Sequence, residues 1–545
     1  MAKRAKRRNQ WKKAAALFLA AALTFGAAGT VLGGQSGTPY SQRPYGEIDL
    51  SKLEELTAQL EEACQPVSPE QPVREITSIE AYVQVLEELD YIATQMAMSD
   101  IRYSADLENE QLASRYEQDA SQAQEAVEMT LSSLQKALAA PDSSGLKTFM
   151  GDDLTQAVQS YEPASQELTR LMDEELELMM EYNRLASQSF TVKVEGKEWD
   201  YESLQEADLD SEEYYHIYIA LERENNRRLG EIYLKLVQVR AKIAEENGYD
   251  SYSDYAYQML YSRDFTPEDT KRLYEPAKES ALLLLEDCWY AQSQDVSEAI
   301  SQDSEALLDT VQRYVGDMDP RLGEAFSYMR EMELYDIGTD GENGSRSGSF
   351  TIELPYDGDA FVFLTRENGF QDFFSLTHEF GHFAAALEEE VPWLYRPNCV
   401  DVCEIQSQGL ELLMLHYKEE LFGDLAEDAQ LQNLGNTMDS IVVGALLDEF
   451  ETTVYENPDL TLEEMNQLFG DLNAQYDQWY FVNDEDGQCF SWVDIGHLYH
   501  QPLYYIGYAA SAYPAMQLWL KSQTDWQGAV NCYMELSAMG VSYPY

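Results

Sequence analysis

Apolar side chains recur every three or four residues through most of this chain, which is the spacing that buries one face of an α-helix. The pattern predicts a mainly helical region from Asp49 to about Asn247 and further helices to about Tyr335. Thr266-Pro267, followed by Asp269, is a typical helix start, with a capping Thr and Pro in the first turn. The expected helices include Leu53–Ala63, Ile79–Met98, Ala113–Ala139, Asp152–Ser187, 211–246, 400–420, 425–456, 461–480 and 500–520.

A few short segments alternate instead, as β-strands do. Phe190–Trp199 turns at Gly196 and is expected to form a hairpin. Two further runs, Ser349–Leu354 and Ala360–Thr365, follow a loop rich in Gly, Asp, Ser and Asn. The pattern therefore predicts a mainly α fold with a small β-sheet.

The N-terminus has a different character. Seven Lys or Arg side chains within residues 3–13 precede an uncharged run from Ala14 to Gly34. A basic segment before an apolar one is typical of export, and the run is near the length that spans a bilayer. We expect residues 1–34 to be a cleaved signal peptide or a retained membrane anchor, and 35–48 to be a linker. Either places the folded part outside the cytoplasm, secreted or at the cell surface.

The excess of acidic residues limits the classes of molecule that the protein is expected to bind. With 36 Lys and Arg against 99 Asp and Glu, the net charge is −63. Such a surface repels phosphate, so a nucleic-acid partner is excluded. We favour a role for this charge in keeping the protein dispersed, although it would also attract cationic peptides. The sequence predicts no oligomeric state.

The segment His378-Glu379-Phe380-Gly381-His382 carries the chemistry. Residues i and i+4 share one helix face, so His378 and His382 can bind one ion together. A catalytic zinc ion takes three protein ligands and leaves one position open. Glu379 would then take a proton from a water activated by the metal and pass it to the leaving amine.

Chance is a poor explanation for this segment. With 6 His and 99 acidic residues among 545, roughly 0.01 matches to H-E-x-x-H are expected at random. The alternative, two unrelated surface histidines on an acidic helix, is therefore weak.

A third ligand has to come from another part of the chain. Residues 399–411 predict the opening of a helix that carries Glu404, while Asp401 is a rival ligand. Glu411, two turns further on, suits a role behind the ligands or in helix packing. Cys399 and Cys403, four apart, are weak evidence for a second metal site.

His-Glu-Phe-Gly-His followed by Glu404-Ile-Gln-Ser-Gln-Gly-Leu-Glu411 resembles the M3 peptidase family, the thimet oligopeptidase and oligoendopeptidase F group. Segments 348–355, 361–364 and 375–378 resemble that family's Gly-rich loop, edge strand and lead-in to the metal helix. His497-Leu-Tyr-His-Gln-Pro502 and the tyrosines after it resemble an oligoendopeptidase F segment. The resemblance covers about 205–515, and more loosely reaches back to 50.

The resemblance implies a helical body with a deep channel for short, unstructured peptides. It divides the chain into an N-terminal helical lobe (49–204) and a catalytic domain (205–545). It implies one zinc ion on His378, His382 and Glu404, with Glu379 as general base. An edge strand at 360–365 would pair with extended substrate, and the residues expected to contact that substrate are Gly348, Phe350, Phe361 and Phe363. His497 and one tyrosine among Tyr504, Tyr505 and Tyr508 would stabilise the oxyanion.

The function expected from these residues is zinc-dependent endopeptidase activity. Two alternatives remain: a carboxypeptidase or dipeptidase of the same H-E-x-G-H clan, or a surface peptide-binding scaffold that has lost catalysis. Intact His378, Glu379, His382 and Glu404 argue against the scaffold.

Overall fold

The computed structural model describes residues 37–540 apart from 66–74, 162–163, 290, 301–302, 340–343, 347, 389–390, 396–398 and 479–480. The predicted signal or anchor (1–34) lies outside the described residues, so the predicted export stays a prediction. Among the helices that the structure describes, none is both long and apolar enough to cross a membrane.

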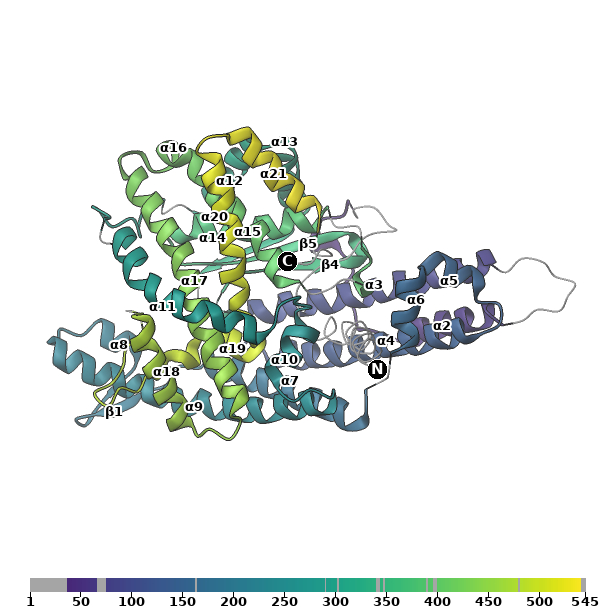
Figure 1. The fold of residues 1–545 in the computed structure, drawn as a ribbon, viewed down its shortest axis with the longest axis horizontal. Helices are drawn as coiled ribbons and strands as arrows, with labels where there is room; N and C mark the ends of the chain where they lie inside the picture. Colours follow the sequence, from purple (N-terminus) through teal and green to yellow (C-terminus); the bar gives the residue numbers. More distant parts are fainter. Residues whose placement is uncertain are drawn as a thin grey trace, which may run out of the picture.

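Helices make up 72% of the described residues, which confirms the prediction of a mainly α fold. Figure 1 shows α2, α5 and α6 at one end of the molecule, with α3 and α4 running from that end into the body. The elements before the sheet are α2 (Ser51–Ala63), α3 (Glu75–Ala105), α4 (Glu110–Ala139), α5 (Ser144–Met150), α6 (Asp152–Gln159), α7 (Gln166–Ala186), β1 (Val192–Val194), β2 (Lys197–Trp199), α8 (Tyr201–Gln205), α9 (Ser211–Glu246), α10 (Tyr252–Tyr255), α11 (Pro267–Trp289), α12 (Ser304–Met318) and α13 (Pro320–Glu331).

The second half contains the larger sheet and the helices that follow it. These elements are β3 (Tyr335–Thr339), β4 (Phe350–Leu354), β5 (Asp359–Arg366), α14 (Phe370–Ala386), α15 (Val400–Met414), α16 (Lys418–Phe422), α17 (Ala426–Glu456), α18 (Leu462–Tyr476), α19 (Gly496–His500), α20 (Ile506–Ser522) and α21 (Trp526–Ala538). Short 3-10 turns are η1 (Tyr40–Gln42), η4 (Pro355–Asp357), η5 (Trp393–Tyr395), η6 (Leu415–Tyr417), η7 (Gly423–Leu425) and η8 (Ser491–Asp494), and η2 (Ala256–Leu260) is a π turn.

Several boundaries agree with the sequence pattern. Helix α9 begins and ends where its periodicity does, and β1 pairs with β2 as the expected hairpin. Thr266 and Asp269 cap each other's backbone at the start of α11. By contrast, the expected helix 152–187 is two helices, α6 and α7, and the expected helix 500–520 begins only at Ile506.

The larger sheet has the strand order β3-β5-β4, with β3 parallel to β5 and β4 antiparallel to it. Strand β3 was not predicted, because Gly and Asp in its short sequence resemble a loop. The order corrects one expectation: 360–365 lies in the central strand β5, both edges of which are paired, and the edge strand is β4. An extended peptide can therefore pair with β4 but not with β5.

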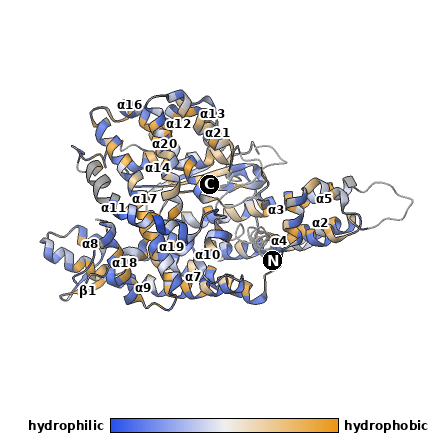
Figure 2. Ribbon diagram, in the orientation of Figure 1, coloured by the Kyte–Doolittle hydropathy of each residue, from blue (hydrophilic) through white to orange (hydrophobic). Residues whose placement is uncertain are grey.

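Two large cores hold the body together, and Figure 2 shows hydrophobic and hydrophilic residues alternating along many of the helices that contribute to them. One core surrounds the three-stranded sheet, α14 and α15. The other joins side chains of α3, α4 and α7 to those of α9, α17 and α18. It thus contains residues from both sides of the expected boundary at 204/205, and the division into those two domains stays a prediction.

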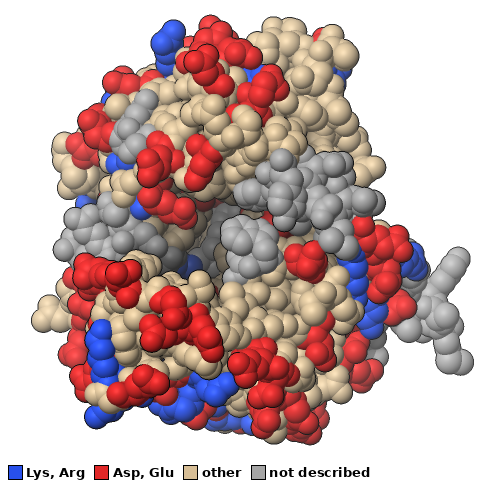
Figure 3. Space-filling view, turned by 90° about the vertical axis from the view of Figure 1, so that its left-hand side faces the viewer, with Lys and Arg blue, Asp and Glu red and all other residues tan. Residues whose placement is uncertain are grey.

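The surface carries the acidity that the composition predicts. Figure 3 shows one face, hollowed at its centre, with Asp and Glu side chains spread over the parts above and below the hollow. Basic side chains are fewer and lie mostly among acidic ones. Any ligand that approaches this face meets a predominantly negative field.

Two neighbouring carboxyl groups, the buried Glu222 and the exposed Asp494, lie where α9 meets η8. Asp494 ends η8 and accepts a hydrogen bond from Asn225 at 2.7 Å. Glu222 accepts one from Tyr201 at 2.9 Å, and its other oxygen has no hydrogen-bond partner in the described structure. Partial desolvation of its carboxyl group and the neighbouring Glu222 raise the pKa of Asp494 to about 7.

This pair makes stability depend on pH, and Asp494→Asn tests it. A folded pKa of about 7 against 3.8 unfolded means that the contribution is complete below pH 3.8 and is lost as pH rises to 7. Because Asn can still accept from Asn225, the variant should lose less thermal stability than the wild type between pH 5 and pH 8. The same change at exposed Asp525 should leave that pH dependence unaltered, and equal slopes for Asp494→Asn and wild type would contradict the prediction.

Candidate metal centre

The centre is built on two neighbouring helices. Helix α14 buries Phe373, Phe374 and Phe380 in the core around the sheet, which turns His378 and His382 toward α15. Glu404, on α15, is 2% exposed, and its Oε2 lies 3.2 Å from Nε2 of His378 and 3.6 Å from Nε2 of His382. One donor atom from each of these three residues lies within 4.8 Å of the other two. Within the described chain, this is the only group of three or more His, Cys, Asp or Glu side chains so arranged.

Gly381 allows the two helices to come this close. A Cβ atom there would lie 2.8 Å from Cα of Ser407 and 2.9 Å from the carbonyl oxygen of Gln406. Both are backbone atoms and cannot rotate away, so any side chain at 381 would push α15 outward. The small residue between the two histidines thus sets the distance from Glu404 to both of them.

Neighbouring side chains orient two of the three candidate ligands, Glu404 and His378. Glu404 accepts hydrogen bonds from Ser407 at 3.1 Å and from the Tyr504 hydroxyl at 2.5 Å. Nδ1 of His378 lies 2.7 Å from Oε1 of Glu411. This contact lets the carboxylate hold the proton on Nδ1 and leave Nε2 facing Glu404, which is the role behind the ligands expected for Glu411.

The charges in the site favour an ionised Glu404 carboxylate beside the two histidines. Burial acts to raise the pKa of Glu404, but the charges and hydrogen bonds of His382 and His378 outweigh it and hold that pKa well below its usual value. Burial acts to lower the pKa of His378, and its bonds to Glu404 and Glu411 raise it instead. The site therefore favours positive charge between these side chains, as a cation would supply.

Glu379 faces a cleft beside the metal ligands. The Thr351 hydroxyl donates to Oε2 of Glu379 at 2.7 Å, and burial raises the pKa of the carboxyl group. The cleft has a volume of about 340 Å³. Its lining comes from one face of α14, the loop before β4, the end of β5 with the residue after it, and α15: Gly348, Ser349, Thr365, Glu367, Gln371, Ser375, His378, Glu379 and Glu411.

The His497 segment approaches Glu404 through the Tyr504 hydroxyl. His497 and three tyrosines form one aromatic cluster, with centroids of Tyr504, Tyr505 and Tyr508 at 5.4, 4.9 and 6.0 Å from the imidazole. Burial and the Arg346 guanidinium lower the pKa of His497 to about 4, so it is neutral near pH 7. The Tyr508 hydroxyl lies 3.4 Å from Nε2 of His497. Tyr504 instead bonds the metal ligand, which separates the roles of the two tyrosines.

The residues expected to contact substrate do not all lie near the centre. Gly348 lines the cleft, and Phe350 begins the edge strand. Phe361 and Phe363 are only 2% and 3% exposed because both belong to the central strand β5. Phe361 packs against Tyr40 and Phe363 stacks on Phe350, so the expectation that these two contact substrate is wrong.

The structure also shows the surroundings of Asp401, the rival third ligand, and of Cys399 and Cys403, the candidates for a second metal site. Both oxygens of Asp401 contact Nε of Arg263, at 3.1 and 3.0 Å, so Asp401 is engaged away from the histidines. Cys399 and Cys403 form no disulfide and have no third metal-binding side chain beside them in the described residues.

Two functional contacts were not predicted. Thr351 lies in a strand whose pattern indicated only alternation, and its contact with Glu379 depends on how the strand packs on α14. Arg263 lies 138 residues before Asp401 in the chain. No local signal in the sequence connects such distant partners.

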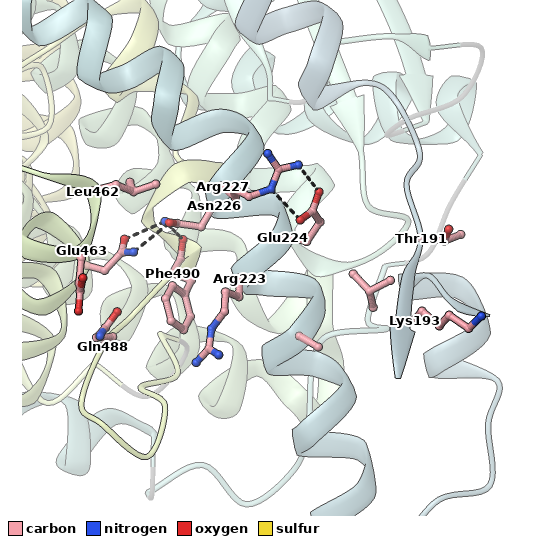
Figure 4. Close-up of a pocket in the computed structure, with 13 residues that line it drawn as sticks. Thr191, Lys193, Arg223, Glu224, Asn226, Arg227, Leu462, Glu463, Gln488 and Phe490 are labelled. Carbon is pink, nitrogen blue, oxygen red and sulfur yellow. Dashed lines mark hydrogen bonds and ion pairs between the residues drawn. The ribbon is translucent and has the colours of Figure 1, made fainter. Parts of the chain in front are cut away.

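A second, larger groove lies between α9, β1 and α18, and Figure 4 shows the side chains around it. Its volume is about 760 Å³, and its described lining contains no His, Cys or Asp. Arg227 is paired with Glu224 at 2.6 Å, and Arg223 lies over the Phe490 ring. This groove offers no catalytic set.

Comparison with known proteins agrees with the motifs. No family model matches the chain. The chain is 28% identical over 212 residues to the chromosomal oligoendopeptidase F of Lactococcus lactis subsp. cremoris, covering 37% of this chain and 34% of that protein. It is 28% identical over 216 residues to oligopeptidase PepF of Bacillus subtilis, covering 37% and 31%. The matched segment thus spans about a third of the length of these relatives.

Solved structures extend the likeness to the whole fold. PZ peptidase A in complex with an inhibitor superposes with a TM-score of 0.77 at 23% identity, covering 93% of each chain. An oligoendopeptidase F from Enterococcus faecium gives 0.54 at 14% identity, covering 90% of each. The chain is therefore similar in sequence to oligoendopeptidase F proteins over about a third of its length, and it shares the fold of these solved structures, which supports the resemblance to the M3 family.

Gly381→Ala tests the close approach of the two helices. The added methyl group meets backbone atoms, so we expect a loss of about 1–3 kcal/mol in the free energy of unfolding. Zinc affinity should fall at least about tenfold because Glu404 moves away from the histidines. Thermal unfolding and competition with a chromogenic chelator measure the two effects.

Gly46→Ala provides the control. Gly46 is exposed, and a Cβ atom there has no heavy atom within 4 Å. It should change neither quantity. Unchanged zinc affinity in Gly381→Ala would show that the spacing of α14 and α15 does not depend on this glycine.

Proposed function

We propose that this protein is a zinc-dependent oligoendopeptidase that hydrolyses short, unstructured peptides. The observation that carries the proposal is the convergence of His378, His382 and Glu404 from two helices, with Glu379 beside them on the cleft. The names of the relatives, oligoendopeptidase F and oligopeptidase PepF, support the same class of activity.

The donor set fits zinc. Two imidazole nitrogens and one carboxylate form a common set of catalytic zinc ligands that leaves a position open. Oε1 of Glu411 lies 2.7 Å from Nδ1 of His378, as a carboxylate behind a metal-binding histidine does. Zinc on these ligands would act as a Lewis acid and lower the pKa of a water toward neutrality.

The protein's own side chains supply the remaining steps. Glu379 accepts a proton from the attacking water and delivers it to the leaving amine, and the Thr351 hydroxyl holds the carboxylate in place for both transfers. Tyr508 and neutral His497 lie together and can donate to the oxyanion of the tetrahedral intermediate. The edge strand β4 can bind the backbone of an extended peptide.

A carboxypeptidase or dipeptidase of the same clan remains the second candidate. Mass spectrometry of peptides with an amidated C-terminus separates the two. An endopeptidase still cleaves them internally, whereas a carboxypeptidase loses its substrate.

Glu379→Gln tests the general base. The variant should keep about one zinc per chain and lose nearly all hydrolysis, because an amide cannot accept the proton. Glu404→Ala should instead lose the metal. Glu388→Gln, an exposed change just beyond α14, serves as the matched control for zinc content and peptide turnover. Wild-type kcat in Glu379→Gln would remove Glu379 from the mechanism.

Tyr508→Phe tests the oxyanion donor. Removing the hydroxyl should lower kcat about a hundredfold, with little change in KM, because an oxyanion contact is made in the transition state. Tyr513→Phe, on the same helix but 66% exposed, controls for the loss of a tyrosine hydroxyl. A rise in KM at constant kcat would assign Tyr508 to substrate binding.

A further inference from the structure

Buried side chains from several elements hold the turn between α19 and α20 by its backbone. Arg240, on α9, donates to the carbonyl oxygens of Leu498, at 2.8 Å, and of Tyr499. The Tyr261 hydroxyl donates to the carbonyl of Pro502 at 2.8 Å, and Glu451 accepts from the Leu503 N–H at 2.8 Å. Leu503 has a φ of 62°, a left-handed conformation that a leucine rarely adopts. The surroundings thus determine the shape of this turn.

Arg263 differs from these other contacts because it also bonds the metal-ligand helix. Its NH1 donates to the carbonyl of Leu503 at 2.8 Å, next to Tyr504. Its Nε lies 3.1 and 3.0 Å from the oxygens of Asp401, one turn before Glu404 on α15. The two side chains are 0% and 3% exposed, and the guanidinium lies 4.4 and 4.6 Å from the Tyr257 and Tyr261 rings. One planar cation therefore connects the Tyr504 turn to α15.

We propose that Arg263 is a positioning residue that sets the Tyr504 turn in register with the Glu404 helix. Through it the Tyr504 hydroxyl meets Glu404 at 2.5 Å, and the first turn of α20 presents Tyr508 to His497 at 3.4 Å. The catalytic consequence rests on the proposed peptidase function, whereas the structural connection does not.

The chemistry of the pair favours this role over simple stabilisation. Replacing a buried ion pair by apolar side chains of similar size is often neutral or stabilising, because both charges lose their hydration on burial. A guanidinium, however, directs several donors along fixed directions in one plane, which a hydrophobic contact or a lysine cannot do. The pair at 263 and 401 thus supplies direction between two elements more than it supplies stability.

The double variant Arg263→Met/Asp401→Leu separates the two roles. It leaves no unpaired buried charge, so thermal unfolding should stay near that of the wild type. Zinc content should remain near one per chain, since all three ligands are kept. We expect kcat on a reporter peptide to fall at least about tenfold with KM little changed, because misplacement by a fraction of an ångström is costly in catalysis. Hydrogen exchange in the metal-free protein should rise within 499–505.

The matched control is Arg43→Met/Asp359→Leu. In this second buried cluster Arg43 forms ion pairs with both Asp357 and Asp359 and ties the N-terminal segment to the start of β5, so the control also carries Asp357→Asn to leave no unpaired charge. Its removal should leave kcat and exchange in 499–505 unchanged. Arg263→Lys keeps the positive charge but lacks the planar, branched guanidinium group. If the double variant does not fold, kcat and hydrogen exchange in 499–505 are measured on Arg263→Lys instead.

Two results would overturn the proposal. One is a stably folded double variant with wild-type kcat and wild-type exchange in 499–505. The other is unchanged kcat and exchange in Arg263→Lys. If the wild type neither binds zinc nor cleaves peptides, the proposed function fails, but the exchange measurement still tests the connection between the turn and α15.

Discussion

The close approach of α14 and α15 at Gly381 is the constraint on which the centre depends. His378 and His382 share one helix by their spacing alone, but Glu404 reaches them only because a bare glycine lets the backbone of Ser407 and Gln406 lie against it. The phenylalanines on the opposite face of α14 hold that helix on the sheet. Core packing on one side and a missing side chain on the other together place three donor atoms around a single point.

Glu404 connects this point to the rest of the molecule. Its carboxylate faces two histidines and also accepts bonds from its own helix, through Ser407, and from the α19–α20 turn, through Tyr504. Arg263 and Glu451 bind the backbone of that turn, and Arg240 binds the backbone of α19 just before it. A buried carboxylate with so many partners is stable as an anion, and each partner restricts its direction. The geometry of the centre is thus a property of several distant segments at once.

Local chemistry explains which parts were predictable. Both ends of α9 and the start of α11 follow from periodicity and capping, which act within a few residues. The His378–His382 pair follows from helix geometry in the same way. Glu404 could be chosen over Asp401 only through the resemblance. The structure supplies the physical reason, which is that Arg263 already binds Asp401.

Pairing between distant segments was not predictable. The apolar run within β5 indicates a strand but does not say which segments pair with it, so its neighbours β3 and β4 could not be inferred from it. Thr351 contacts Glu379 for a reason of the same kind, since strand register decides which side chain meets α14. The contacts that position the catalytic groups mostly join segments far apart in the sequence. The local spacing of apolar residues does not predict such contacts.

The acidic surface makes the stability of the fold depend on the ions in the surrounding solution. Folding gathers a net charge of −63 into a smaller volume than the unfolded chain occupies, so self-repulsion opposes compaction. Dissolved cations shorten the range of that repulsion, to about 8 Å at physiological ionic strength. The counterions around this protein therefore contribute to its stability, and its free energy of folding depends on the ionic strength of the surrounding solution.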